Sequence, residues 1–157
     1  MANKNLKYFM RDESKQEQIF QVPAPARFVD EKGEVVQMEV KKLHNDTIAR
    51  INDMYKSRIP MKDKKGNYIV QNGEVVFRSE KDSVKATRHI IAEALVYPDL
   101  KDPELMKYYD CVDITDMPLK VFPGNDEYAY VSRKVLEILG LMDAAENNER
   151  EVEDAKN

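Results

Sequence analysis

Two groups of acidic residues have types and spacing that could support chemistry: Asp110, Asp113 and Asp116, and Asp99, Asp102 and Glu104. Carboxylate oxygens are the ligands that hard cations such as Mg²⁺ and Ca²⁺ prefer. However, Asp102-Pro103-Glu104 is also typical of a helix N-terminus, with a cap, a proline in the first turn and an acid that complements the helix dipole. The other group lacks the glycine-hinged spacing of a calcium loop. Structural or solvent-exposed roles are therefore expected for both, and a small metal- or carboxylate-dependent enzyme is the alternative.

The remaining reactive side chains are few: one cysteine, Cys111, and two histidines, His44 and His89. A single cysteine excludes an internal disulfide and a zinc knuckle, and a nucleophilic thiol would need a thiolate-stabilising partner that no neighbouring histidine supplies. The sequence also has no phosphate-binding P-loop, no nucleophile elbow and no glycine-rich dinucleotide turn. We therefore predict a protein without catalytic residues, metal or cofactor.

Aromatic residues carry more information about function than these groups do. Five tyrosines lie in the second half of the chain: Tyr97, Tyr108, Tyr109, Tyr128 and Tyr130. Tyrosine packs through its ring and hydrogen-bonds through its hydroxyl, which suits protein interfaces. For each of them a role in the core or at its rim is the alternative. The class of function that this pattern favours is protein binding.

The first half of the chain predicts two β-hairpins separated by a helix. Residues 27–40 contain a turn at Gly33 and a second arm in which Val36, Met38 and Val40 alternate with polar residues, as in a half-buried strand. Ile19–Val22 could form a strand, which Pro23 would confine to an edge. Apolar spacing predicts a helix near 46–59. A second hairpin is expected near 67–77, where Asn72-Gly73 is the pair best suited to a two-residue turn.

The second half predicts helices, at 80–96, 103–109 and 126–139. In each the apolar residues recur at three- and four-residue intervals, and each stops at or near a breaker such as Pro98 or Gly140. A single helical turn is expected between Thr115 and Phe122. The predicted fold class is α+β, mainly α: a helical bundle with small antiparallel hairpins.

Length and composition indicate one folded domain. The chain has 157 residues, of which 42% are hydrophobic and 34% charged, and this length normally supports one core. We expect a single domain at 1–142, with 1–18 as an arm that can be mobile. Residues 143–157 contain six acids, two bases and one large apolar residue, Val152, and predict a frayed or disordered acidic tail.

The charge distribution narrows the class of partner. Lys and Arg outnumber Asp and Glu by 18 to 13 over residues 1–88, whereas the acids lead by 16 to 7 over 89–157. The basic surplus is small and interleaved with acids, so a nucleic-acid partner is not expected. The chain lacks an apolar run long enough to cross a bilayer, and its first residues lack the apolar core of a signal peptide. The expected location is the cytoplasm, with no membrane partner.

Three blocks of residues resemble the XkdN-like family of phage tail assembly chaperones. Arg27-Phe28-Val29-Asp30-Glu31-Lys32-Gly33 is similar to the family's opening hairpin, and Tyr97-Pro98-Asp99-Leu100 to the turn between two of its helices. The segment from Phe122 through Tyr128 to Leu141 is similar to its closing helix. The hairpin at 67–77 has no clear counterpart there.

The resemblance implies a helper that binds the tape-measure protein in the cytoplasm of the bacterial host, assists tail-tube assembly and is absent from the mature phage, prophage or phage-tail-like particle. The tail-tube protein is a further candidate partner, and self-association is compatible with this role. A structural tail component is the alternative. The candidate partner-binding residues are Arg27, Phe28, Tyr97, Pro98, Leu100, Tyr109, Phe122 and Tyr128.

Overall fold

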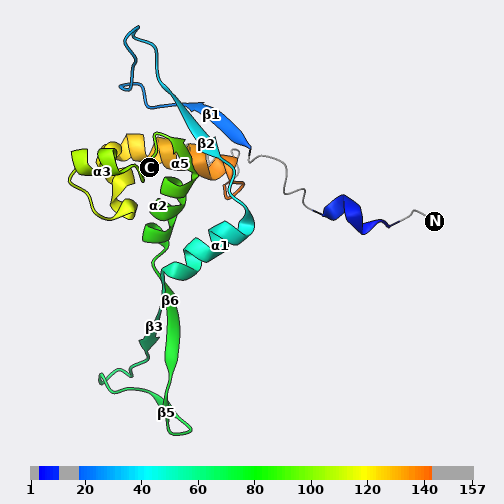
Figure 1. Cartoon of the computed structure of the whole chain (residues 1–157). Helices are drawn as coiled ribbons and strands as arrows, with labels where there is room; N and C mark the ends of the chain where they lie inside the picture. The colour runs from blue at the N-terminus through cyan, green and yellow to red at the C-terminus, as the bar shows by residue number, and fades with distance from the viewer. Residues whose placement is uncertain (1–3, 11–17, 143–157) are drawn as a thin grey trace, which may run out of the picture.

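A computed structural model describes residues 4–10 and 18–142, so the predicted acidic tail lies outside the described residues. The elements in chain order are η1 (Leu6–Phe9), β1 (Ile19–Pro23), β2 (Gln37–Lys41), α1 (Asn45–Met54), β3 (Lys56–Pro60), β4 (Val70–Gln71), β5 (Glu74–Val75), β6 (Phe77–Lys81), α2 (Ser83–Ala94), β7 (Leu95–Tyr97), α3 (Pro103–Tyr108), η2 (Ile114–Asp116), α4 (Met117–Val121) and α5 (Asn125–Ile138). The helices gather around the first strands, and β3–β6 extend away from them (Figure 1).

The main sheet has the strand order β1-β2-β7 and is antiparallel throughout. β1 lies at its edge, which is where Pro23, lacking an N–H, is tolerated. β2 is the central strand, and its alternation places Met38 and Val40 on the buried face. The predicted hairpin at 27–40 is only partly right, because the long ladder pairs 19–23 with 37–41, and Val29↔Val35 is an isolated bridge.

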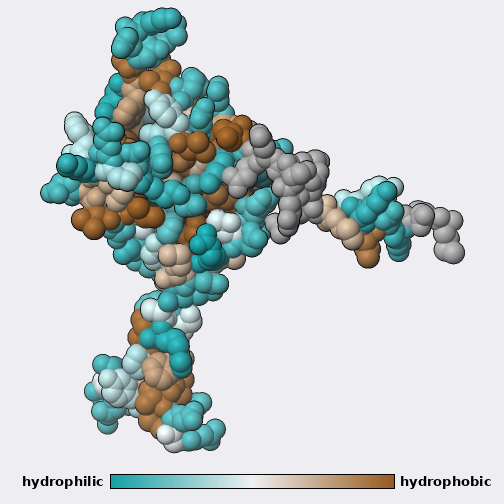
Figure 2. All heavy atoms as spheres, in the orientation of Figure 1, coloured by the Kyte–Doolittle hydropathy of each residue, from teal (hydrophilic) through white to brown (hydrophobic). Residues whose placement is uncertain are grey.

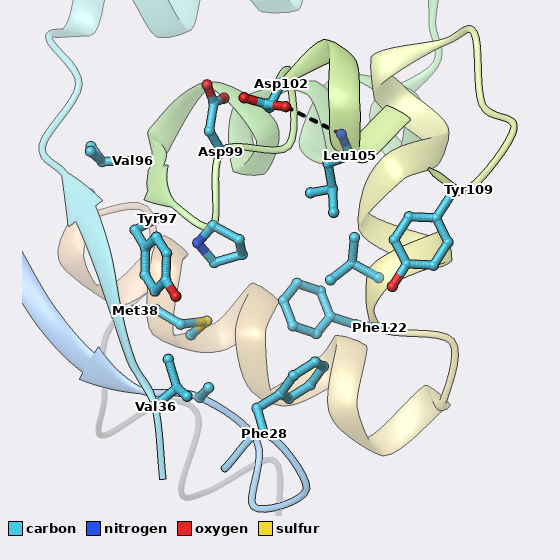
Figure 3. A pocket seen from close by; sticks show the side chains of 13 residues that line it. Phe28, Val36, Met38, Val96, Tyr97, Asp99, Asp102, Leu105, Tyr109 and Phe122 are labelled. Atoms are coloured by element: carbon cyan, nitrogen blue, oxygen red, sulfur yellow. Dashed lines mark hydrogen bonds between the residues drawn. The ribbon is translucent and has the colours of Figure 1, made fainter. Parts of the chain in front are cut away.

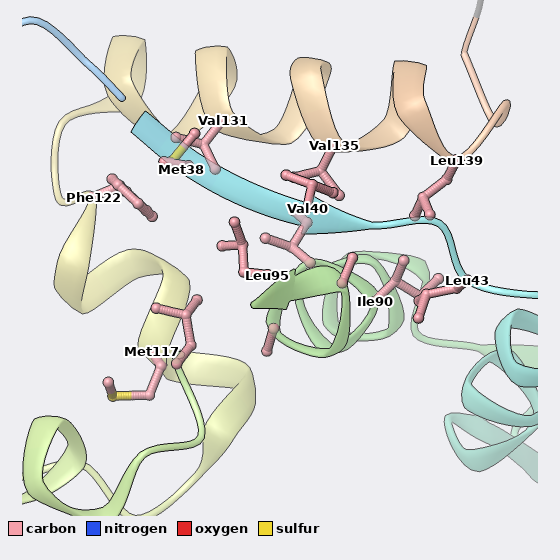
Figure 4. Close-up of a cluster of buried hydrophobic side chains, with 14 of the residues drawn as sticks. Met38, Val40, Leu43, Ile90, Leu95, Met117, Phe122, Val131, Val135 and Leu139 are labelled. Carbon is pink, nitrogen blue, oxygen red and sulfur yellow. The ribbon is translucent and has the colours of Figure 1, made fainter. Parts of the chain in front are cut away.

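The core lies between the main sheet and the helices (Figure 4). Val40 from β2 lies between Val135 of α5 and Leu95 of β7, and all three are buried. Tyr130 also links α5 to the sheet, because its hydroxyl donates a hydrogen bond to the Pro23 carbonyl over 2.8 Å. Each buried aliphatic side chain of this kind stabilises the fold by about 1.5–3 kcal/mol.

Residues 56–81 form a separate two-stranded structure, which we call the ribbon. β3 pairs with β6, and β4 with β5 nearer the tip. At its base the Asp82 amide donates to the Tyr55 carbonyl over 3.0 Å. The tip turn lies where the sequence predicts it: Asn72 and Gly73 have φ angles of 52° and 78°, as a two-residue hairpin turn requires. No residue of the ribbon is buried.

The predicted helical bundle is wrong. Within the described residues the fold is α+β with three small antiparallel sheets, and helices do not clearly predominate. The physical reason is that β2 runs through the core, so that α5 and α2 pack on a strand as well as on each other (Figure 4).

Two helices are shorter than predicted, because residues beside their ends form strands instead. The helix expected at 46–59 ends at Met54, because Lys56–Pro60 pairs with β6. The helix expected at 80–96 begins at Ser83 and ends at Ala94. Leu95–Tyr97 is extended because it pairs with β2. In both cases a distant strand supplies the hydrogen bonds that a further helical turn would have made.

No helix in the described ranges is long and apolar enough to cross a membrane.

Candidate functional site

An apolar groove of about 490 Å³ opens between the main sheet and the short helices α3 and α4 (Figure 3). Its lining comes from four separate parts of the chain: Ala24, Phe28, Val36 and Met38; Val96, Tyr97, Pro98 and Asp99; Asp102, Leu105 and Tyr109; and Val121 and Phe122. Asp99 and Asp102 are the only charged residues among these thirteen. A groove of this size and apolarity fits the side chains of a binding partner.

The floor of the groove is fixed by packing between aromatic rings. Phe122 is buried at the end of α4, and the Phe28 ring meets it edge to face, with ring centroids 5.6 Å apart. Figure 3 shows these two rings together at the base of the groove. Edge-to-face pairs of this kind are favourable beyond the apolar area that they bury. The floor is therefore preformed.

One rim of the groove comes from β7 and the turn that follows it. Val96 and Tyr97 are exposed, with 37% and 52% of their surface open to solvent, although both line the groove. Large apolar side chains left exposed beside a groove are typical of a surface that a partner covers.

The opposite rim belongs to α3, a short helix that Asp102 begins. The Asp102 carboxylate accepts hydrogen bonds from the amides of Glu104 and Leu105 over 2.9 and 3.2 Å. This confirms the predicted cap and satisfies two amides that would otherwise lack a partner. The cap sets the start of α3, and hence the place of Leu105 and Tyr109 in the groove wall.

Arg27 is not part of the groove lining, but it contacts Phe28, which is. Its guanidinium pairs with the Glu127 carboxylate, donates to the Val121 carbonyl over 3.0 Å and lies 4.0 Å from the centroid of the Phe28 ring. The hydrogen bond to Glu127 raises the pKa of Arg27. Arg27 is thus a positioning residue that joins the loop before β2 to α4 and α5.

Five of the eight predicted partner-binding residues meet in the groove: Phe28, Tyr97, Pro98, Tyr109 and Phe122. Leu100 is fully buried in the core and cannot face a partner. Tyr128 does not line the groove and is half-buried, and its burial raises the pKa of the phenol.

The sequence-based list missed the aliphatic part of the groove: Ala24, Val36, Met38, Val96, Leu105 and Val121. Strand alternation did place Val36 and Met38 on an inward face. The pattern could not show that this face is only partly covered by helices, because that depends on where α3 and α4 pack.

Three members of the two acidic groups, Asp99, Asp102 and Asp113, accept hydrogen bonds from nearby backbone amides. Asp113 accepts hydrogen bonds from the Thr115 amide and hydroxyl over 2.9 and 2.8 Å, and these bonds lower its pKa. Cys111 donates to the Asp113 carbonyl over 3.1 Å. In residues 4–10 and 18–142, no three acidic, histidine or cysteine side chains come close enough together to hold a metal ion.

His89 belongs to a polar pair away from the groove. Its Nδ1 lies 2.6 Å from the Tyr55 hydroxyl, at the end of α1. Burial lowers the pKa of His89, since the charged imidazolium loses hydration there. The pair joins α1 to α2 beside the base of the ribbon.

Comparison with known proteins agrees with the resemblance seen in the sequence. The family model described as "Phage XkdN-like tail assembly chaperone protein, TAC" matches residues 6–156. The chain is 30% identical to the phage-like element PBSX protein XkdN of Bacillus subtilis over the full length of both proteins. It is 32% identical to the B. subtilis protein YqbN, over 98% of this chain and 93% of the relative.

A solved structure shares the fold. The crystal structure of the protein YqbN matches with a TM-score of 0.67 and 26% sequence identity, covering 88% of this chain and 98% of that one. Together with the family match over nearly the whole sequence, these relatives show that the chain belongs to the family of XkdN-like phage tail assembly chaperones.

Proposed function

We propose that this protein binds the tape-measure protein of a phage, prophage or phage-tail-like particle through the apolar groove, and keeps it from aggregating while tail-tube subunits assemble around it. A chaperone of tail assembly needs a tail protein as its partner, and a tape measure is long and rich in apolar helical segments. The proposed contact residues are Phe28, Tyr97, Pro98 and Tyr109, with Val96 and Leu105 between them.

The observation that carries the proposal is a preformed apolar groove, bounded by exposed Val96 and Tyr97, in a chain of this family. Grooves of this kind take the apolar face of an amphipathic helix, while the polar surface around them keeps the free protein in solution. Binding and release of this kind require no covalent chemistry. We place the activity in the cytoplasm of the bacterial host, before the mature particle forms, and expect the protein to leave that particle.

Co-expression with the tape-measure protein of the same phage, prophage or particle tests the proposal. We expect the two proteins to co-purify and the soluble fraction of the tape-measure protein to rise. Val96→Arg places a bulky charge in the apolar lining of the groove and should weaken co-purification by at least about tenfold, because the partner would have to bury that charge against apolar side chains.

Val84→Arg is the matched control, because Val84 is exposed on the first turn of α2 and does not line the groove. It should bind as the unchanged protein does. Equal loss of binding in both variants, or no gain in tape-measure solubility with the unchanged protein, would contradict the proposal. Detection of the chain in purified particles would instead support a structural tail component.

A further inference from the structure

The ribbon is the largest surface that the proposed function leaves unexplained. It comprises 26 residues, 56–81, without one buried side chain. A two-stranded hairpin alone in water is only marginally stable, and a third strand or a packed partner normally supports it. In the described structure the ribbon extends away from the body (Figure 1), and each of its two sheets has only two strands. Its sequence nevertheless specifies a well-formed tip turn.

The tip of the ribbon has an exposed apolar surface, made of residues from three neighbouring ladders. Val70 pairs with Val75, Phe77 pairs with Pro60, and Tyr68 forms an isolated bridge with Lys62. Tyr68, Val70, Val75 and Phe77 are all exposed, by 37% to 56%. Figure 2 shows hydrophobic surface on the projecting ribbon. Patches of this kind on a projecting element mark interaction sites.

Two basic side chains, Arg58 and Lys62, lie against the aromatic rings of this apolar surface. The guanidinium carbon of Arg58 lies 4.5 Å from the centroid of the Phe77 ring, and Lys62 Nζ lies 5.2 Å from that of Tyr68. Across residues 56–81 there are seven Lys and Arg against three Asp and Glu, a net charge of +4. The rest of residues 1–88 has eleven against ten. The basic surplus of the first half of the chain is therefore concentrated in the ribbon.

The groove has the complementary character. Its lining is apolar, and its two charged residues, Asp99 and Asp102, are both acidic. Within residues 4–10 and 18–142 neither carboxylate forms an ion pair with a basic side chain. The apolar surface of the ribbon, with basic side chains beside it, is therefore complementary in polarity and in charge to the apolar groove with its two carboxylates.

We propose that the ribbon of one copy of this protein binds in the groove of a second copy. Because the ribbon extends away from the body (Figure 1), it cannot reach its own groove while its base strands stay paired. Pairing of two ribbons edge to edge is the competing arrangement, and the net charge of +4 on each ribbon opposes it, since like charges on neighbouring strands repel.

The contact is heterologous: each copy offers one ribbon and accepts one. Such contacts produce head-to-tail chains or closed rings. The same groove would then serve a second copy in the absence of client and the tape-measure protein in its presence. The contact itself does not depend on the identity of the client, so it can be tested with the full-length protein alone.

Sedimentation velocity over a wide range of protein concentration tests the contact. The unchanged protein should show a mass that rises with concentration. The ribbon variant Tyr68→Ser/Val70→Ser and the groove variant Val96→Arg should each lower the association constant at least about tenfold. Mixed together, they should form a one-to-one heterodimer and nothing larger, because the pair retains one intact ribbon and one intact groove.

Val84→Arg is again the control and should associate normally. Far-ultraviolet circular dichroism would show whether the serine changes unfold the ribbon. If they do, Lys64→Glu/Lys65→Glu tests the contribution of the positive charges of the ribbon and leaves its apolar residues unchanged. It should weaken association most at low salt.

Three outcomes would overturn the proposal: an unchanged protein that is monomeric at every concentration, a mixture of the two variants that stays monomeric, or a groove variant that still associates normally, which would indicate ribbon-to-ribbon pairing. Association without tape-measure binding would refute the proposed function and leave this contact intact. Tape-measure binding without association would do the reverse.

Discussion

At the scale of single residues, the polar side chains of this protein position apolar ones. Arg27 fixes Phe28 in the groove floor through contacts with Glu127 and the Val121 carbonyl. Asp102 sets the first turn of the helix that supplies the opposite rim. Neither residue needs to touch a partner for its loss to weaken binding.

The Tyr55–His89 pair gives a prediction about pH. Burial lowers the pKa of His89 in the folded state, whereas in the unfolded chain the imidazole takes up a proton at its ordinary pKa of about 6.5. The unfolded state therefore binds more protons as the pH falls through that value, and the free energy of unfolding should fall with it. Urea unfolding at pH 7.5 and at lower pH values should show this loss.

His89→Gln should remove this part of the pH dependence, because glutamine does not titrate. His44→Gln is the comparison, since His44 precedes α1 at an exposed position. If His89→Gln retained the full dependence between about pH 7 and pH 5, other groups would be responsible for it.

At the scale of elements, the ribbon adds no residue to the core of the body. Its ends meet at the hydrogen bond between the Asp82 amide and the Tyr55 carbonyl. The ribbon contributes no buried side chain, and core burial is where most stability comes from.

Excision of residues 56–81, with a short glycine-containing turn joining Tyr55 to Asp82, should therefore leave the body folded. We expect the free energy of unfolding to change by less than about 1 kcal/mol, because surface changes away from the core usually have small effects. Chemical denaturation measures it. A large loss of stability would show that the ribbon supports α1 and α2, contrary to this prediction.

The sequence predicts those elements whose signals are local. The Asn72-Gly73 turn and the Asp102 cap are where the sequence places them, because each depends on residues within one turn of the chain. β3 and β7 could not be predicted in this way. They are extended because strands far away in the sequence offer them hydrogen bonds, and helical spacing next to them favoured one more turn of helix.

In the candidate site, too, some residues could be predicted from the sequence and others could not. Phe28, Tyr97 and Phe122 were identified through resemblance to the family, and all three line the groove. Their convergence depends on the packing of the sheet against α4, which no short pattern encodes. The same limit explains Leu100: it lies two residues after Pro98 in the same turn, but its side chain faces the core.

At the scale of the whole molecule, a single core joins the first hairpin to the last helix. Buried residues from the main sheet, α1, α2, α4 and α5 belong to one cluster (Figure 4). The groove is the place where this cluster reaches the surface. The binding surface and the core therefore share Ala24, Met38, Val121 and Phe122.

Leu100→Ala tests the reassignment of Leu100 from partner contact to core. We expect it to lower the free energy of unfolding by about 2–5 kcal/mol, as buried leucine truncations do. Leu119→Ala is the matched control, because Leu119 is 40% exposed on α4, and its loss should stay within about 1 kcal/mol. Urea denaturation of both variants measures the difference. Equal stability of the two variants would contradict the assignment of Leu100 to the core.

The closed base of the ribbon has a consequence for how chains of this kind diverge. Because residues 56–81 contribute no buried side chain and their ends meet at the Tyr55–Asp82 hydrogen bond, we expect substitutions, insertions or deletions among them to leave the core packing unchanged. Selection can then act on the ribbon for partner choice alone, at little cost in folding. Keeping two such chaperones in one cell from mixing also requires a matching change in the groove. There the exposed rim residues Val96 and Tyr97 can vary without disturbing the core, whereas buried lining residues such as Met38, Val121 and Phe122 cannot.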